Sequence, residues 1–253
     1  MRAIVTGASR GIGRAIALRL AQVPNAHVAL MARSGKASTH ANGTLKQTME
    51  QIHQLNPSAL VTPIEVDLSD AADTACAFER ALKELGGLDA LVINASALSL
   101  DPTPTAKKIG LLCDLNVKST LISIASCTDE LIKSNGAIVT MAPPVRLDHP
   151  MLSQLSAYTT TKYAMAVATF GAASRGVRAN TLWPRRLVRT AATKLIEDSN
   201  VVQDAYTKGR DADDVAIATV KLLQGMHSGK AFFDDEVTEL PETDAPFDPF
   251  FVP

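Results

Sequence analysis

The stretch Thr6-Gly7-Ala8-Ser9-Arg10-Gly11-Ile12-Gly13 follows directly on the apolar run Arg2–Thr6 and opens the helical pattern Gly11–Gln22. Glycines at such a turn let the backbone bend sharply and come close to a pyrophosphate. Unpaired N–H groups and the positive end of the helix dipole then bind the anion. The alternative is a plain strand–helix turn, but three glycines in this context favour a dinucleotide site.

Short, almost continuously apolar runs alternate with amphipathic helical patterns along most of the 253 residues. Apolar runs of this kind are typical of parallel strands that are buried on both faces. The alternation predicts an α/β fold in a single domain, a Rossmann-type doubly wound parallel sheet of about seven strands with helices on both faces. The predicted strands are Arg2–Thr6, His27–Ala32, Leu60–Glu65, Ala90–Asn94, Ala137–Met141, Arg178–Leu182 and Lys230–Asp234. The predicted helices are Gly11–Gln22, Gly43–Leu55, Ala71–Leu85, Gly110–Ser134, Leu152–Ser174 and Ala212–Gln224.

Residues 1–238 are predicted to form the dinucleotide-binding domain, including the substrate site, and residues 239–253 to form a separate tail. The tail is rich in proline, which excludes a regular helix or a central strand. Its phenylalanines predict that it packs on its own subunit or on a neighbour. The polar stretch Ser34–Asn42 is predicted to be an exposed loop after the second strand.

The composition of the chain indicates which kinds of binding partner and which cellular compartment to expect. The net charge of -1, with no run of basic residues, argues against nucleic acid or a membrane as the main partner. No window reaches the roughly 18 apolar residues of a membrane span. Three scattered cysteines, Cys76, Cys113 and Cys127, are predicted to be buried thiols in a reducing compartment. A cytoplasmic protein is expected, with a peroxisome or another organelle left open. No metal site is predicted, because His149 and His227 lack partners at ligand spacing.

The end of the second predicted strand bears on the choice of cofactor. An NAD-binding site usually places an acid there to hold the ribose 2′-hydroxyl. This chain has Ala32 at that place and Arg33 one residue later. A guanidinium can bind a 2′-phosphate through two hydrogen bonds, and Arg10 in the glycine turn lies where it could reach the same group. Either arginine alone could be a solvated surface charge, but the two together predict NADP(H).

A tyrosine and a lysine, Tyr158 and Lys162, are four residues apart in a predicted helix, so they lie on one helix face. A free tyrosine has a pKa near 10 and is rarely ionised at neutral pH. A neighbouring lysine cation lowers such a pKa toward a working range. Tyr158 is therefore predicted to act as a general acid/base that exchanges a proton with an alcohol or carbonyl.

With these motifs the chain resembles the short-chain dehydrogenase/reductase family up to about Asp235, including the family's Gly-xxx-Gly-x-Gly spacing. The double proline, the Leu-Trp-Pro segment and the ending Ser228–Asp235 resemble the hydroxysteroid-dehydrogenase-like subgroup. The resemblance implies an NADP(H)-dependent oxidoreductase that transfers a hydride between the nicotinamide and a small-molecule carbonyl or alcohol. It also implies a homodimer or homotetramer, formed by pairing of the two long helices.

The resemblance further assigns roles to single residues. Lys162 is expected to hydrogen-bond the nicotinamide ribose, and Asn116 to hold a water in a lysine-linked proton relay. Asn116 could instead kink or cap its helix, and Asp67, the expected adenine contact, could instead be a turn or capping residue. The predicted catalytic residues are Tyr158, Lys162 and Asn116. The predicted cofactor-binding residues are Gly7, Ser9, Arg10, Gly11, Ile12, Gly13, Arg33, Asp67, Leu68, Asn94, Ala95, Ser96, Tyr158, Lys162, Pro184 and Thr190.

One departure from the family concerns the serine that orients the substrate. The segment after the fifth predicted strand has Ala142-Pro143 and no hydroxyl at the matching place. Loss of such a donor commonly costs on the order of a hundredfold in rate. Ser153, Ser156 or a backbone N–H are candidates to replace it. The alternative function is therefore a catalytically weak or inactive NADP(H)-binding sensor or scaffold.

The apolar residues Met151, Leu152, Leu187 and Val188 follow the segments that border the substrate in this fold. They indicate either a moderately hydrophobic ligand or loops anchored on the protein. The sequence leaves both interpretations open.

Overall fold

The computed structural model describes residues 1–33, 43–147, 152, 155–198, 204 and 206–239. The predicted loop Ser34–Asn42 and all but the first residue of the tail 239–253 lie outside this part of the chain. Seven parallel strands form one sheet in the order β3-β2-β1-β4-β5-β6-β7. Their bounds are β1 Arg2–Thr6, β2 His27–Ala32, β3 Leu60–Glu65, β4 Ala90–Ile93, β5 Ala137–Met141, β6 Arg178–Trp183 and β7 Ala231–Phe233.

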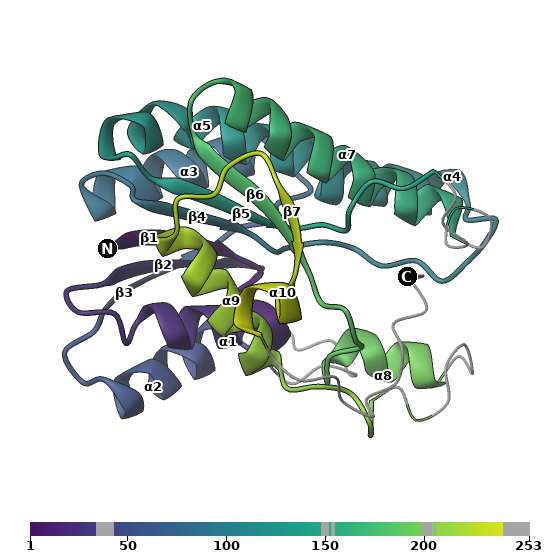
Figure 1. Cartoon of the computed structure of the whole chain (residues 1–253), viewed down its shortest axis with the longest axis horizontal. Coiled ribbons are helices and arrows are strands. Elements are labelled where there is room, and N and C mark those ends of the chain that lie inside the picture. The colour runs from purple at the N-terminus through teal and green to yellow at the C-terminus, as the bar shows by residue number, and fades with distance from the viewer. Residues whose placement is uncertain (34–42, 148–151, 153–154, 199–203, 205, 240–253) are drawn as a thin grey trace.

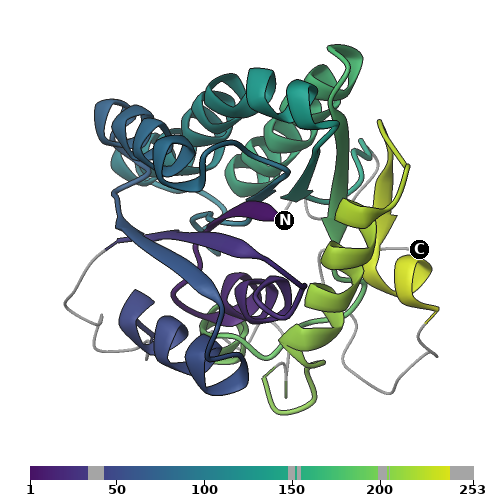
Figure 2. The same cartoon turned by 90° about the vertical axis from the view of Figure 1, so that its left-hand side faces the viewer.

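Helices cover both faces of the sheet (Figures 1 and 2), as predicted for a doubly wound fold. One face carries α1 (Gly11–Leu20), α2 (Leu45–Leu55) and α9 (Ala212–Gln224). The other face carries α3 (Ala71–Leu85), α5 (Ser119–Ser134) and α7 (Ser156–Ser174). Successive residues of β1 alternate between these two cores, since Ala3 and Val5 pack on the first and Ile4 on the second. This double burial explains why the strands read as continuous apolar runs.

Short elements at the carboxyl end of the sheet complete the fold. They are α4 (Ala106–Leu112), the π-helical turn η1 (Cys113–Lys118), α8 (Ala191–Asp198) and α10 (Asp234–Thr238). Figure 1 shows α4 and α8 at the same end of the molecule, above and below the strand ends. Neither α8 nor α10 was predicted from the sequence.

Several predicted boundaries are wrong by a few residues, for local reasons. The helix predicted from Gly43 begins at Leu45, because Thr44 caps it in a capping box with Gln47. The helix predicted from Gly110 begins at Ala106, capped by Thr105.

The helix predicted from Leu152 forms α7 only from Ser156 onward. At the other end of the chain, the strand predicted to reach Asp234 ends at Phe233, because Asp234 begins α10.

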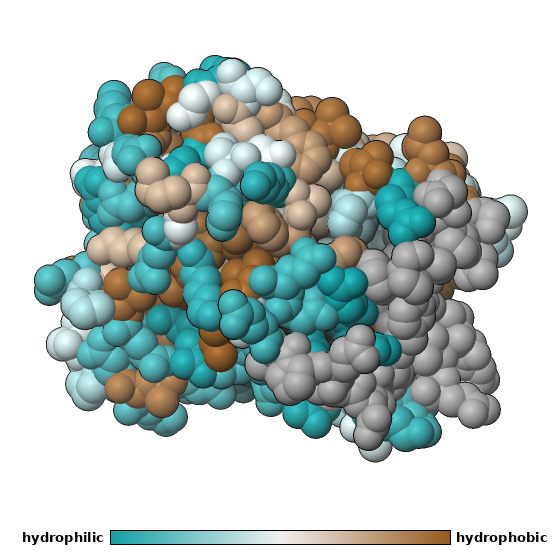
Figure 3. All heavy atoms as spheres, in the orientation of Figure 1, coloured by the Kyte–Doolittle hydropathy of each residue, from teal (hydrophilic) through white to brown (hydrophobic). Residues whose placement is uncertain are grey.

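The elements α4, η1 and α5 form one continuous and largely apolar helix over Ala106–Ser134. By length and composition it could cross a membrane, contrary to the expectation that no window would qualify. Its α5 part packs side by side with α3 and α7, as a core helix of an α/β domain does. Figure 3 shows polar and apolar residues interspersed over the face of the molecule seen in Figure 1.

The prediction of three buried thiols holds for Cys127 only, because Cys76 and Cys113 are exposed. Cys76 lies in α3 on the solvent side, where the neighbouring Ala77 and Phe78 take the buried positions. Burial raises the pKa of the Cys127 thiol.

Candidate active site

A cavity of about 800 Å³ opens at the carboxyl ends of the strands. It lies at the point where the strand order reverses between β1 and β4, which is the usual ligand site of an open parallel sheet. Among the predicted site residues, Gly13 and Asn116 are the two that do not line it. The predicted residues that line it are Gly7, Ser9, Arg10, Gly11, Ile12, Arg33, Asp67, Leu68, Asn94, Ala95, Ser96, Tyr158, Lys162, Pro184 and Thr190.

The glycine turn is held against the sheet by its backbone. The N–H groups of Gly7 and Ala8 donate to the carbonyl oxygen of Met31 at 2.8 and 3.1 Å. Gly7 has a φ of +70°, in the left-handed region that favours glycine. A Cβ on Gly13 would overlap the Gly7 carbonyl oxygen, so Gly13 lies behind the turn and permits its close approach to α1.

The N-terminus of α1 faces the cavity without a capping side chain. Its N-cap residue, Arg10, makes no side-chain capping hydrogen bond, whereas Thr44 caps α2 and Asp70 caps α3. The first N–H groups of α1 are therefore left for a ligand. Arg14, which the sequence analysis missed, steadies the turn by donating from Nε and Nη2 to the Ser9 carbonyl oxygen at 3.1 and 2.5 Å.

Asn94 ties the glycine turn to the loop after β4. Its Nδ2 donates to the Thr6 carbonyl oxygen at 3.0 Å, and its N–H donates to Thr6 Oγ1 at 3.0 Å. The Ala95 N–H also donates to Thr6 Oγ1, at 3.1 Å. These bonds end β4 at Ile93, one residue earlier than predicted, and leave Ala95 and Ser96 on the cavity wall.

Arg10, Arg33 and Asp67 line the end of the cavity next to β2 and β3. The hydroxyl and N–H of Ser69 donate to Asp67 Oδ1 at 2.7 and 3.0 Å. These bonds, with a smaller contribution from Arg33, hold the pKa of Asp67 below its usual value. Asp67 is thus both a turn residue and a cavity residue, while the cap of α3 is Asp70.

Tyr158 and Lys162 line the cavity from α7, with 6% and 1% of their surface exposed. The Lys162 ammonium donates to the Met141 carbonyl oxygen and lies 5.2 Å from the centroid of the Trp183 ring. Burial lowers the pKa of Lys162 to about 7. Its charge near neutral pH is therefore sensitive to any group that enters the cavity.

Asn116 lies in the π-helical turn η1 and is completely buried. Its Oδ1 accepts from the Ala97 N–H at 2.7 Å. Its Nδ2 donates to the Ala97 carbonyl oxygen at 3.1 Å and to Thr161 Oγ1 at 2.9 Å. The structure thus places Asn116 at a helix irregularity, where its side chain joins the loop after β4 to α7. Isolated π-turns of this kind often occur at functional sites.

At the place of the family's serine, the structure has no hydroxyl. Ala142 is completely buried, and its N–H donates to the carbonyl oxygens of Thr140 and Leu182 at 2.9 and 3.2 Å. Of the candidate replacements, Ser156 is exposed, and Ser153 lies outside the described residues. Trp183, which the sequence analysis did not single out, lines the cavity and has a buried Nε1 without an acceptor in the described part of the chain.

The segment after β6 is anchored to α10 through Arg185. The Arg185 N–H donates to Asp234 Oδ1 at 2.8 Å, and its guanidinium pairs with Asp235 at 2.5 Å and Glu236 at 2.9 Å. Asp234 also pairs with the buried Arg210 at 3.4 Å. Burial raises the pKa of Asp234, and these partners offset that effect only in part. The network holds Pro184 and its neighbours at the cavity wall.

Aliphatic side chains surround Tyr158 and Trp183. The buried cluster around them contains Leu112, Leu155, Leu187 and Ile196. Of the apolar residues considered from the sequence, Leu187 lies in this cluster and Val188 packs into the core beneath α1 and α9. Leu152 is half-buried, and Met151 is outside the described residues. Within those residues, no group of three His, Cys, Asp or Glu side chains is placed to hold a metal ion.

Known proteins share sequence with most of this chain. Cattle (Bos taurus) hydroxysteroid dehydrogenase-like protein 2 is 37% identical over 204 residues, which is 78% of this chain and 48% of that protein. The human (Homo sapiens) protein of the same name is 34% identical over 227 residues, covering 87% of this chain and 52% of that protein. The chain therefore spans about half the length of these curated relatives.

Solved structures extend the comparison to the whole fold. A short chain dehydrogenase from Mycobacterium thermoresistibile superimposes with a TM-score of 0.86 at 28% identity, covering 98% of this chain and 94% of that one. A short chain dehydrogenase from Burkholderia cenocepacia, solved in complex with NADP, gives a TM-score of 0.72 at 26% identity, with 92% and 95% covered. The sequence profile of the family described as short chain dehydrogenase matches residues 1–200. The chain belongs to the short-chain dehydrogenase/reductase family.

Proposed function

We propose that the chain is an NADP(H)-dependent oxidoreductase that interconverts a carbonyl and an alcohol. The observation that carries the proposal is the position of Tyr158 and Lys162. Both line, from α7, the same cavity as the glycine turn and Arg10. A general acid/base and a dinucleotide cradle in one cavity are the two parts that hydride transfer to a carbonyl needs.

The residues present fit a dinucleotide that carries a 2′-phosphate. A Cβ on Gly7 would lie 2.8 Å from Asn94 Nδ2, so only glycine at this position lets the turn pack closely on the loop after β4. The uncapped N-terminus of α1 would hold the pyrophosphate. Arg10 and Arg33 would hold the 2′-phosphate, with Ala32 where an acid would repel it. The NADP found in the related Burkholderia structure supports the same choice.

The chain's own residues would then act as follows. When bound, the nicotinamide supplies or accepts a hydride. Tyr158 donates its hydroxyl proton to the carbonyl oxygen during reduction and takes it back during oxidation. A protonated Lys162 favours the phenolate form of Tyr158 by its charge. Leu187 and Ile196, in the cluster around Tyr158, keep water from that side of the phenol.

The test is a Tyr158→Phe variant, with Tyr163→Phe as the matched control on the same helix. Both phenols are buried, but the Tyr163 hydroxyl donates to the Arg146 carbonyl oxygen. We expect Tyr158→Phe to lower NADPH-dependent carbonyl reduction by about 10²- to 10⁴-fold while the Kd for NADPH changes less than about threefold. Tyr163→Phe should keep its activity. Unchanged turnover in Tyr158→Phe would refute the assignment.

A second candidate function is a catalytically weak NADP(H)-binding sensor or scaffold. It is favoured by Ala142, which offers no hydroxyl and whose N–H is already bonded within the protein. Tight NADPH binding together with no turnover over a broad panel of carbonyls would support this function instead.

We also propose that the chain forms a homodimer or homotetramer through α5 and α7. Exposed apolar side chains on these helices, Leu121, Ile132 and Val167, support this arrangement. Light scattering during size-exclusion chromatography would report the mass, and a monomer at micromolar concentration would contradict the proposal.

A further inference from the structure

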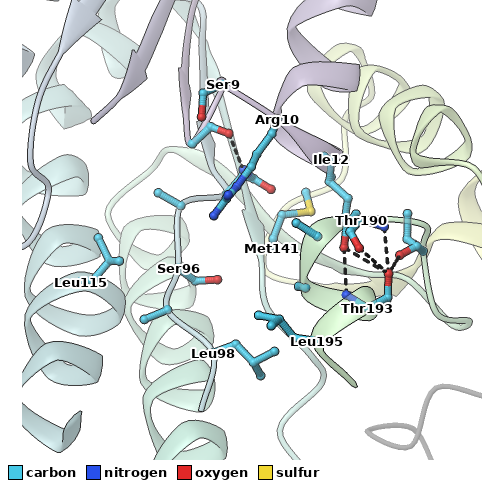
Figure 4. Close-up of a pocket in the computed structure, with 18 of the residues that line it drawn as sticks. Ser9, Arg10, Ile12, Ser96, Leu98, Leu115, Met141, Thr190, Thr193 and Leu195 are labelled. Atoms are coloured by element: carbon cyan, nitrogen blue, oxygen red, sulfur yellow. Dashed lines mark hydrogen bonds between the residues drawn. The ribbon is translucent and has the colours of Figure 1, made fainter. Parts of the chain in front are cut away.

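The two ends of the cavity differ in the polarity of the residues that line them. Arg10, Arg33 and Asp67 are charged and lie toward β2 and β3. Beyond Tyr158, leucine and isoleucine dominate the lining, and they come from the loop after β4, from α4, η1 and α8, and from the segment after β6. These residues are Leu98, Leu111, Leu115, Leu187, Leu195 and Ile196. Figure 4 shows Ser9 and Arg10 at one end and Leu98 and Leu195 at the other.

Two of these leucines lie in the open part of the cavity. Leu111 on α4 is 47% exposed and Leu195 on α8 is 53% exposed. They belong to the two helices that stand above and below the strand ends (Figure 1). Scattered exposed leucines need no explanation, but leucines that line one concave wall are typical of a ligand site.

Among the described residues, the polar side chains near the leucines include Thr193, Lys162 and Arg186. The Thr193 hydroxyl donates to the Val188 carbonyl oxygen at 2.7 Å, so it is occupied within the protein. Lys162 is buried against Met141, and Arg186 lines the wall beside Leu187. A flexible alkyl chain needs only apolar contacts, and Leu98, Leu111 and Leu195 provide them as a leucine wall.

We propose that the site takes aliphatic aldehydes or ketones, and the matching alcohols, with the alkyl chain along Leu98, Leu111 and Leu195. The proposal rests on the function proposed above and specifies its substrate class. In the reduction, a hydride from NADPH adds to the carbonyl carbon and the C=O π bond opens. The oxygen takes the Tyr158 proton, and NADPH is oxidised to NADP⁺. The wall fixes the chain so that the reacting carbon lies at Tyr158.

The test measures kcat/KM with NADPH for straight-chain aldehydes from butanal to decanal. Each methylene that the wall buries should raise kcat/KM by about threefold to fourfold, until the chain extends past the leucines. Leu195→Ser and Leu111→Ser should each lower kcat/KM for decanal by about tenfold and leave butanal within about twofold. The control Leu55→Ser removes an equally exposed leucine (59%) from α2, away from the cavity, and should behave as wild type.

A binding measurement separates this proposal from the proposed activity. Trp183 is the chain's one tryptophan and lines the cavity, so its fluorescence reports on ligands there. Decanamide has the ten-carbon chain but is not reduced. Its Kd, measured from the change in Trp183 fluorescence, should be at least tenfold lower than the Kd of butanamide. Leu195→Ser should weaken decanamide binding by about tenfold and leave butanamide binding within about twofold.

The outcomes are distinct. Decanamide binding that depends on Leu195, without turnover of any aldehyde, would support the alkyl site and refute the activity. Turnover that is independent of chain length and unaffected by Leu195→Ser would refute the alkyl site and leave the activity standing.

Discussion

Replacing Lys162 by Met should stabilise the folded protein and weaken its binding of NADPH. Lys162 is 1% exposed, and its ammonium is held by the Met141 carbonyl oxygen and by the face of Trp183. Methionine has a similar length and no charge to desolvate. The substitution therefore removes the main cost of placing a lysine in this position.

The size of the effect follows from the pKa of Lys162, which burial lowers from 10.5 to about 7. An amine whose pKa is lower in the folded state binds more protons when unfolded, so its contribution to stability rises with pH between about 7 and 10.5. At pH 7 the burial costs on the order of 4 kcal/mol. The variant leaves the Met141 carbonyl without its donor, at about 1–3 kcal/mol. The expected net gain is about 2 kcal/mol at pH 7.

Urea unfolding of both proteins between pH 6.5 and 9.5 measures this difference. We expect the advantage of Lys162→Met to shrink by up to about 1.4 kcal/mol per pH unit above pH 7, as the wild type gains stability. Lys46→Met, on the exposed surface of α2, is the control and should show no such trend. A variant that is less stable than wild type by the same amount at every pH would refute the reasoning. Calorimetry should show NADPH binding at least tenfold weaker in Lys162→Met, because a charged hydrogen bond is lost.

Two further predictions concern residues that position the walls of the cavity. Gly13→Ala should weaken NADPH binding more than tenfold and destabilise the fold, because its Cβ would overlap the Gly7 carbonyl oxygen. Gly110→Ala, with open space around it in α4, should instead stabilise the protein by about 1 kcal/mol. Calorimetry and urea unfolding check both, and equal effects would contradict the prediction. Asp234→Asn should cost about 3 kcal/mol of unfolding free energy, because it leaves the buried Arg210 without its carboxylate. Asp204→Asn, in an exposed pair with Lys208, should stay within about 0.5 kcal/mol, and a similarly small effect at Asp234 would refute the anchoring role.

The sheet could be predicted from the sequence because its five inner strands, β2, β1, β4, β5 and β6, are buried on both faces. Burial on both faces requires a short run of apolar residues, which is visible in the sequence. The strands predicted for β1, β2, β3 and β5 match the structure at both ends. The boundaries that failed depend on contacts across the chain. Asn94 leaves β4 because its amide bonds to Thr6, 88 residues away, and no local pattern contains that information.

The site was predictable where a local motif carries the chemistry. The glycine turn and the pair Tyr158 and Lys162 are such motifs, and the structure brings them to one cavity. No local sequence pattern assigns a role to Arg185. Its structural role depends on Asp234, which lies 49 residues later in the chain and accepts a hydrogen bond from the Arg185 N–H. The leucine wall could not be predicted from the sequence either, because its residues come from separate elements, among them the unpredicted α8.

The two dissociation constants for NADPH and NADH, measured by calorimetry on the wild-type protein, test the central claim most directly. A guanidinium on a phosphate contributes about 1.5–3 kcal/mol, so Arg10 and Arg33 should make NADPH bind at least tenfold more tightly than NADH. NADH that binds as tightly as NADPH, or more tightly, would contradict the assignment of these arginines to a 2′-phosphate. Failure to bind either would contradict the account of the cavity as a dinucleotide site.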